Sequence, residues 1–253
     1  MSSRSSNPSP IRGFLADAGR TIVPRQGYRH GPLPPILLLL TVVTGIVDAI
    51  SFLSLGRVFV ANMTGNVVFL GFGLAGEVSL SVPSSLTSIG TFLIGAAVAG
   101  RLFCRFVDNR GRLVAFVTSV EAGLIAVALL AALLAPSVES VHYVLIVLLS
   151  LAMGFKNAMA RTLGVPELKI TVLTLTLTRL AADAAAGVGL KAFPGRRIVA
   201  VLAMFVGAFV GGLLTLHVAV SAALALALLL TGTVAMASHY LSRAQPPWTR
   251  PVS

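Results

Sequence analysis

Charged residues are scarce in this chain, and their scarcity excludes most soluble folds. Only 11% of the 253 residues are charged, whereas 56% are hydrophobic. Soluble domains carry about 25% charged residues, so this chain has too little polar surface to face water on every side. Aromatic residues are also few, at 7%, and apolar and polar residues do not alternate as in the strands of a membrane barrel. The composition therefore predicts an all-α membrane protein.

Cysteine is almost absent, which limits the chemistry available to the chain. Cys104 stands alone, so there is no intramolecular disulfide, no cysteine-cluster metal site and no redox pair. The histidines are scattered near predicted segment ends, and no HExxH, GxSxG, P-loop or dinucleotide-binding motif occurs in its proper context. These absences predict that the protein is not an enzyme and binds no cofactor.

The net charge of +11 does not indicate a nucleic-acid partner. The basic residues lie between apolar blocks and at the chain ends, with no soluble domain to present them. The positive-inside rule of membrane topology accounts for almost all of them. The expected partners are therefore the lipid bilayer and an unknown small solute or ion, and the sequence leaves self-association into an oligomer open.

Eight apolar stretches follow a start that is rich in Ser, Pro and Arg. Most are long enough to cross the roughly 30 Å hydrocarbon core as a helix that rises 1.5 Å per residue. They cover 35–55, 60–76, 86–106, 113–134, 141–160, 170–190, 198–217 and 219–240. The second and sixth stretches carry several polar residues, which predicts that their helices are broken or re-entrant.

The distribution of Lys and Arg favours six crossings over eight. If all stretches cross, the basic linker 101–112 lies outside and the linker 135–142, which has no Lys or Arg, lies inside. Both placements violate the positive-inside rule. If the second and sixth stretches enter and leave on one side, nearly all basic residues lie inside. The sequence thus predicts a bacterial inner-membrane protein with both termini cytoplasmic. A disordered basic tail, 1–34, and a short tail, 241–253, flank one transmembrane domain, 35–240.

The chain also contains an internal repeat with an offset of about 110 residues. Pieces of the first half, about 35–135, match pieces of the second, about 141–240, in the same order. One match sets Gly45-Ile-Val-Asp48-Ala49 against Gly154-Phe-Lys-Asn157-Ala158. Each half would hold three crossings and one broken segment, and an odd number of crossings places the two halves in opposite orientations. Secondary transporters use such inverted repeats, and their sites lie at the repeat interface near interrupted helices.

The candidate site residues of the first half are polar groups placed inside apolar stretches. Asp48 lies near mid-membrane, where a carboxylate costs roughly 2.5–3.5 kcal/mol and should face a cavity or a partner. It is either a proton or cation site or a structural carboxyl, which is hydrogen-bonded to the broken segment or paired with a cation. That segment carries residues that either expose backbone N–H groups to a solute or cap a re-entrant helix. They are Asn62, Thr64, Gly65 and Asn66.

The second half offers a related set. Lys156 and Asn157 occupy the repeat position of Asp48. Lys156 can approach Asp48 near the pseudo-twofold axis, but extension of its long side chain to the cytoplasmic surface is the favoured interpretation. Thr174 belongs to a threonine-rich stretch whose hydroxyl groups either line a site or bond back to their own helix. Glu121, inside the fourth stretch, is ambiguous.

Two strings of residues resemble a known family. The string from Thr44 to Gly56, followed by Val58 to Asn66, is similar to the signature of the YoaK-like bacterial membrane proteins. The resemblance covers roughly 35–240 and implies about six membrane spans, but no established activity. The chain departs from the family pattern at Lys156, where Gln is expected, and at Leu175, where Gly is expected. Both departures argue against a second site that mirrors the first.

Together these features favour a small-solute permease or channel made of two inverted repeats, with proton coupling through Asp48 as one option. The alternative is a non-transporting membrane protein that binds lipid or a partner protein, or that assists assembly. A water-accessible cavity that reaches Asp48 would favour transport. A closed core at that depth would favour the alternative.

Overall fold

The fold is seen in a computed structural model, which describes residues 31–103, 109–135, 139–164 and 194–243, with the single residues 19, 21, 178 and 249. Within these residues the protein consists of helices and contains no strand. The helices are α2 (Leu33–Ser54), α3 (Met63–Leu74), α4 (Val82–Phe103), α5 (Arg110–Leu134), α6 (Glu139–Leu163), α8 (Pro194–His217) and α9 (Val220–Arg243). The predicted tails and the sixth apolar stretch lie almost entirely outside the described residues.

Six of the described helices, all except α3, are long and apolar enough to cross a membrane. Their outward faces carry large apolar side chains that the bundle leaves exposed, such as Leu93, Phe205 and Leu229. Lipid chains can cover these faces, whereas the backbone polar groups are satisfied within each helix. The predicted polytopic helical bundle is therefore confirmed for the described part of the chain.

Local capping explains why some helices begin before the predicted apolar stretch. In α4 the Ser81 hydroxyl accepts the N–H of Ser84 at 3.2 Å, and Pro83 is tolerated in the first turn. In α5 the Asn109 side chain accepts the N–H of Arg112 at 2.9 Å. These caps satisfy N–H groups that the first helical turn leaves free. The polar first turns lengthen both helices beyond their apolar cores.

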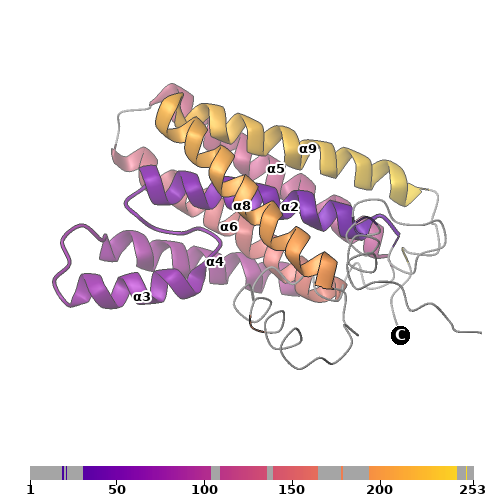
Figure 1. The fold of residues 1–253 in the computed structure, drawn as a ribbon, viewed down its shortest axis with the longest axis horizontal. Coiled ribbons are helices and arrows are strands. Elements are labelled where there is room, and N and C mark those ends of the chain that lie inside the picture. Colours follow the sequence, from indigo (N-terminus) through magenta and orange to yellow (C-terminus); the bar gives the residue numbers. More distant parts are fainter. Residues whose placement is uncertain are drawn as a thin grey trace, which may run out of the picture.

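The bundle is organised around α2, which packs along α8 and α9 (Figure 1). α4 packs along α6, and α5 packs along both α6 and α9. Glycines allow two of these contacts to be very close. A Cβ on Gly45 of α2 would lie 2.4 Å from the carbonyl oxygen of Met204, and a Cβ on Gly154 of α6 would lie 2.3 Å from that of Phe92. Only glycine fits where helix backbones approach this closely.

The same two interfaces contain a second pair of glycines, seen from the opposite helix. Gly207 of α8 faces the carbonyl of Val42, and Gly95 of α4 faces the carbonyl of Leu151. In the repeat found in the sequence, Gly95 corresponds to Gly207, and Gly45 corresponds to Gly154. The glycines that the predicted repeat sets against each other thus lie at the α2–α8 and α4–α6 interfaces.

The chain between α2 and α4 enters the bundle and returns to the same end. An irregular segment, 55–62, leads inward from α2, and α3 then runs back beside α4 (Figure 1). Arg57, before α3, donates from Nη1 to the hydroxyl of Ser79, beyond α3, at 3.1 Å. Because α3 has 12 residues, it is about 18 Å long and too short to cross. The prediction that the second stretch is broken or re-entrant, and is not a full crossing, is confirmed.

Candidate functional site

Asp48 holds the irregular segment inside the bundle. Its side chain is only 4% exposed, and its Oδ1 accepts the backbone N–H groups of Val60 at 3.0 Å and Ala61 at 2.8 Å. Hydrogen bonds to a charged acceptor are each worth about 1.5–3 kcal/mol. Of the two roles that the sequence allowed, this geometry gives Asp48 the structural one.

Asn66 holds the same segment from the other side. Its amide oxygen accepts the N–H of Phe59 at 2.8 Å, and its amide nitrogen donates to the carbonyl of Phe59 at 2.6 Å. Ser88 of α4 donates to that carbonyl as well, at 2.6 Å, and shares a hydrogen bond of 2.9 Å with Ser150 of α6. These side chains thus make the hydrogen bonds that water would otherwise make to the irregular backbone inside the bundle.

Replacing Asn66 by leucine is expected to lower the free energy of unfolding by about 1–3 kcal/mol, because the buried N–H of Phe59 loses its acceptor. Asn62→Leu is the matched control on the same segment, since the Asn62 side chain is exposed and makes no cap hydrogen bond. Unfolding in mixed micelles by added SDS measures both. Equal losses in the two variants would contradict the assigned role of Asn66.

The remaining candidates on the first broken segment do not join Asp48. Asn62 and Thr64 are exposed at the start of α3. Gly65 packs on the ring of Phe59, where a Cβ would lie 2.8 Å from a ring carbon. Only Asn66 of this group turns inward. The structure therefore does not gather the predicted polar residues of this segment around one shared cavity.

Lys156 points into the bundle rather than toward the surface. Its side chain is 2% exposed, its ammonium donates to the Thr44 hydroxyl of α2, and the ammonium lies 2.9 Å from the sulfur of Met153. Electrostatic interactions join it to Glu121 and Asp48. The favoured prediction that Lys156 extends to the cytoplasmic surface is wrong. The two acidic groups and the hydroxyl replace the water that the ammonium would otherwise need.

Glu121 is the third ionisable residue of this region. It lies on α5, its side chain is 0% exposed, and within the described part of the chain neither carboxyl oxygen has a hydrogen-bond partner. Its electrostatic partner is Lys156. Asp48 of α2, Glu121 of α5 and Lys156 of α6 are called the central cluster below. The sequence marked Glu121 as ambiguous and did not place it with the other two.

The structure describes only one of the last two predicted site residues. Asn157 follows Lys156 on α6 and is half-buried. Thr174 lies outside the described residues. Among the residues that the structure does describe, no group of three or more His, Cys, Asp or Glu side chains could hold a metal ion. A cluster that contains an ammonium group also repels metal cations.

Three further polar residues contribute to the hydrogen bonds described above, although the sequence did not predict them: Thr44, Ser88 and Ser150. Each lies within an apolar span and is buried. A serine or threonine inside an apolar stretch was therefore the signal that the sequence offered. It was a weak signal, because serine and threonine hydroxyls often bond back to their own helix, as Thr44 also does to Leu40 at 2.7 Å.

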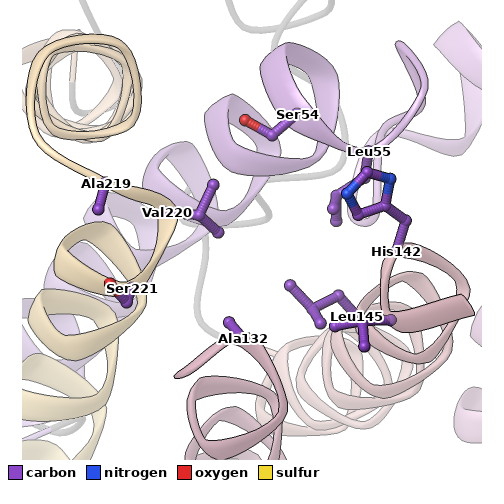
Figure 2. A pocket seen from close by; sticks show the side chains of 9 residues that line it. Ser54, Leu55, Ala132, His142, Leu145, Ala219, Val220 and Ser221 are labelled. Atoms are coloured by element: carbon purple, nitrogen blue, oxygen red, sulfur yellow. The ribbon is translucent and has the colours of Figure 1, made fainter. Parts of the chain in front are cut away.

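A pocket of about 170 Å³ opens at one end of the bundle (Figure 2). Its lining comes from the end of α2, the end of α5, the start of α6 and the turn between α8 and α9. The residues are Ser54, Leu55, Ala132, Val141, His142, Leu145, Ala219, Val220 and Ser221. Val141 and His142, from the predicted linker 135–142, thus lie at the same end of the bundle as Ala219, from the turn between α8 and α9.

The central cluster lies beneath this pocket, between three of the same helices. At 1.5 Å per residue, Asp48 is about 9 Å along α2 from the pocket residue Ser54, and Lys156 is about 17 Å along α6 from Leu145. Buried apolar side chains occupy the intervening levels of these helices. They include Ile50, Ile125, Ala128, Leu149 and Ala152, called the apolar layer below. The pocket ends above this layer and does not include Asp48.

The apolar spans, the re-entrant α3 and the buried ionisable residues together define a polytopic α-helical membrane protein. The chain belongs to the family described as "Protein of unknown function (DUF1275)", whose model matches residues 36–237. It is similar to the UPF0700 transmembrane protein YoaK of Bacillus subtilis (strain 168), with 36% identity over 156 residues. The match covers 58% of this chain and 65% of that relative. The resemblance to the YoaK-like family is thus confirmed, and no solved structure matches the chain.

Proposed function

We propose that this protein is a small-solute permease of the bacterial inner membrane, with both termini in the cytoplasm. The observation that carries the proposal is the central cluster. Three ionisable side chains from three spans are buried together inside the bundle. Charged groups inside a bilayer are costly, and they usually mark the path of a substrate or an ion.

The matched glycine contacts support an arrangement of two inverted repeats. An operation that exchanges the halves replaces α2 by α6 and α4 by α8, and it carries the Gly45 contact onto the Gly154 contact. Asp48 and Lys156 then lie on corresponding helices at the interface of the repeats. Transporters of this architecture bind their substrates and coupling ions at that interface.

The apolar layer supplies the gate that such a mechanism needs. The pocket above it is mostly apolar, with polar groups from Ser54, His142 and Ser221. A volume of 170 Å³ suits a solute of few atoms that carries one or two hydrogen-bonding groups. Rocking of the α2–α8 pair against the α4–α6 pair would part the layer and connect the pocket with the central cluster.

One observation favours the alternative of a non-transporting membrane protein. The core between the pocket and Asp48 is closed, because Ile50, Leu149 and their neighbours are fully buried. A permease opens this layer transiently, whereas a scaffold for lipid or protein partners keeps it closed. Access of water to the layer therefore separates the two functions.

A cysteine-accessibility experiment measures that access. Because Cys104 is the one native cysteine, Cys104→Ser gives a cysteine-free background. In proteoliposomes of this background, Leu149→Cys in the apolar layer should react with a membrane-impermeant maleimide at least tenfold faster than Leu130→Cys. The Leu130 side chain is 57% exposed on the outer surface of α5 and faces lipid in the proposed arrangement. The difference in rate would arise because opening of the layer admits water.

Ser221→Cys in the pocket is the positive control, since its side chain lines an open cavity. The reagent is applied from both sides of the membrane in turn. If Ser221→Cys reacts while Leu149→Cys stays as slow as Leu130→Cys from either side, the layer does not open and the permease proposal fails.

A further inference from the structure

With Lys156 present as an ammonium, the charges of the central cluster balance only if one of its two carboxyl groups is neutral. Asp48 accepts two backbone N–H groups, as an ionised carboxylate does. The ammonium of Lys156 donates to Thr44 and interacts with both Glu121 and Asp48, but its one positive charge can compensate only one carboxylate. An ionised Glu121 would add a second buried negative charge. Such a charge is expensive without donors, and burial then favours the neutral acid.

Among the described residues, no donor forms a hydrogen bond with the carboxyl oxygens of Glu121. α6 contributes Lys156, and α2 contributes Asp48 to the same cluster. The buried residues of α9, which packs along α5, include no ionisable side chain. On α5 itself the nearby hydroxyl of Thr118 donates to the carbonyl of Val114 at 2.8 Å. Among the described residues, both Glu121 oxygens are thus buried without a hydrogen bond.

We propose that Glu121 is the proton-binding carboxyl of this protein. It carries a proton in the closed conformation and releases it when the apolar layer opens. In that step the O–H bond of the carboxyl breaks, the proton passes to water in the opened path, and the electron pair remains on the carboxylate. Water admitted by the opening, together with the nearby ammonium of Lys156, then stabilises the new negative charge. The inference rests on the proposed permease function and names the proton as its coupling ion.

This assignment moves the coupling role from Asp48 to Glu121. The Asp48 carboxylate is engaged by Val60 and Ala61, and its protonation would weaken the hold on the re-entrant segment. Glu121 has no such structural task within the described residues. A metal cation is a poor substitute for the proton, because it needs several oxygen ligands and would lie beside an ammonium group.

The small number of acidic residues makes the protonation state measurable. The chain has four glutamates, at positions 77, 121, 139 and 167. Glutamate labelled with ¹³C at the side-chain carboxyl therefore gives few signals, and Glu121→Gln assigns one of them. In lipid nanodiscs at neutral pH, the Glu121 signal should have the chemical shift of a protonated acid. A carboxylate shift for Glu121 at neutral pH would overturn the inference.

Glu77 is the internal reference for an ionised carboxyl. It lies in the exposed loop after α3, where hydrogen bonds from Ser79, and to a smaller extent the charge of Arg57, hold the pKa of Glu77 below its ordinary value. It is therefore ionised at neutral pH. Glu121→Gln is nearly isosteric with a protonated glutamate and should fold, so its effects can be read in the reconstituted protein.

The link between proton release and opening is tested by labelling Leu149→Cys at several pH values. Rates are divided by those of Ser221→Cys, which corrects for ionisation of the thiol. If opening releases one proton, the normalised rate rises with pH by up to about tenfold per unit. Glu121→Gln should abolish this rise, and Glu77→Gln should leave it unchanged.

The outcomes separate the two proposals. Labelling of Leu149→Cys with a pH dependence that Glu121→Gln does not alter, or with none at all, overturns the inference and leaves the permease standing. Absence of labelling at every pH overturns the permease, and a protonated Glu121 signal would then show that the buried acid exists without a transport role.

Discussion

Lys156→Met is expected to lower the free energy of unfolding by about 3–5 kcal/mol, as observed when one partner of a buried ion pair is removed. Methionine keeps most of the side-chain length but removes the ammonium that donates to Thr44. The buried carboxylate of Asp48 then lacks its compensating cation. Unfolding in mixed micelles, followed by circular dichroism as the SDS fraction rises, measures the loss.

A second substitution tests whether charge is the cause. In Lys156→Met/Asp48→Asn the remaining charge is removed, while the asparagine oxygen can still accept the N–H groups of Val60 and Ala61. The double variant should be at least about 1 kcal/mol more stable than the sum of the single losses predicts. Arg101→Met, at an exposed position, is the control and should change stability by less than about 0.5 kcal/mol. Strict additivity would show that Lys156 and Asp48 are not coupled, and the charge balance of the central cluster would fail.

The spans of this protein could be predicted well because a membrane restricts the length and composition of the helices that cross it. Length and composition marked every described span within a few residues of its observed ends. The re-entrant α3 could be predicted too, since the polar residues around Asn62 and the positions of Lys and Arg excluded a simple crossing. These features depend on the order of residue types along the chain, which a sequence displays directly.

The inward direction of Lys156 could not be predicted in the same way. Its distance from the end of α6 at Leu163 is about 10 Å, and a lysine side chain at such a position can extend to the surface. The rotation of α6 about its axis decides the direction. That rotation is fixed by the contact of Gly154 with the backbone of Phe92 on α4. Because the contact depends on two helices, the sequence of α6 alone does not reveal it.

The place of Glu121 in the central cluster could not be predicted for a related reason. α5 is apolar on all sides, so its sequence does not reveal which face turns inward. Its contacts with α6 and α9 select the face that carries Glu121. Asp48 shows the converse case, since its two possible roles were both visible in the sequence. The positions of the Val60 and Ala61 N–H groups, far along the chain, were needed to choose between them.

Alanine substitutions at Gly45 and Gly154 are expected to destabilise the protein by similar amounts, each about 1–3 kcal/mol, because an added methyl group overpacks the interface. The new Cβ would lie 2.4 Å from the Met204 oxygen in one case and 2.3 Å from the Phe92 oxygen in the other. Both obstacles are backbone atoms of a rigid helix, so the helices must move apart. Thermal and SDS-induced unfolding of the two variants, compared side by side, measure the effect.

Gly212→Ala is the matched control, since its Cβ would meet only the Leu53 side chain at 3.7 Å, an ordinary contact. Alanine also suits a helix better than glycine, so this variant should be as stable as the parent or slightly more stable. The comparison bears on function as well as packing. If the halves are inverted copies, Gly45 and Gly154 belong to one kind of interface used twice, and each substitution should impair it equally. A large loss at one glycine with full tolerance at the other would show two unrelated interfaces, and the twofold relation that supports the permease proposal would be lost.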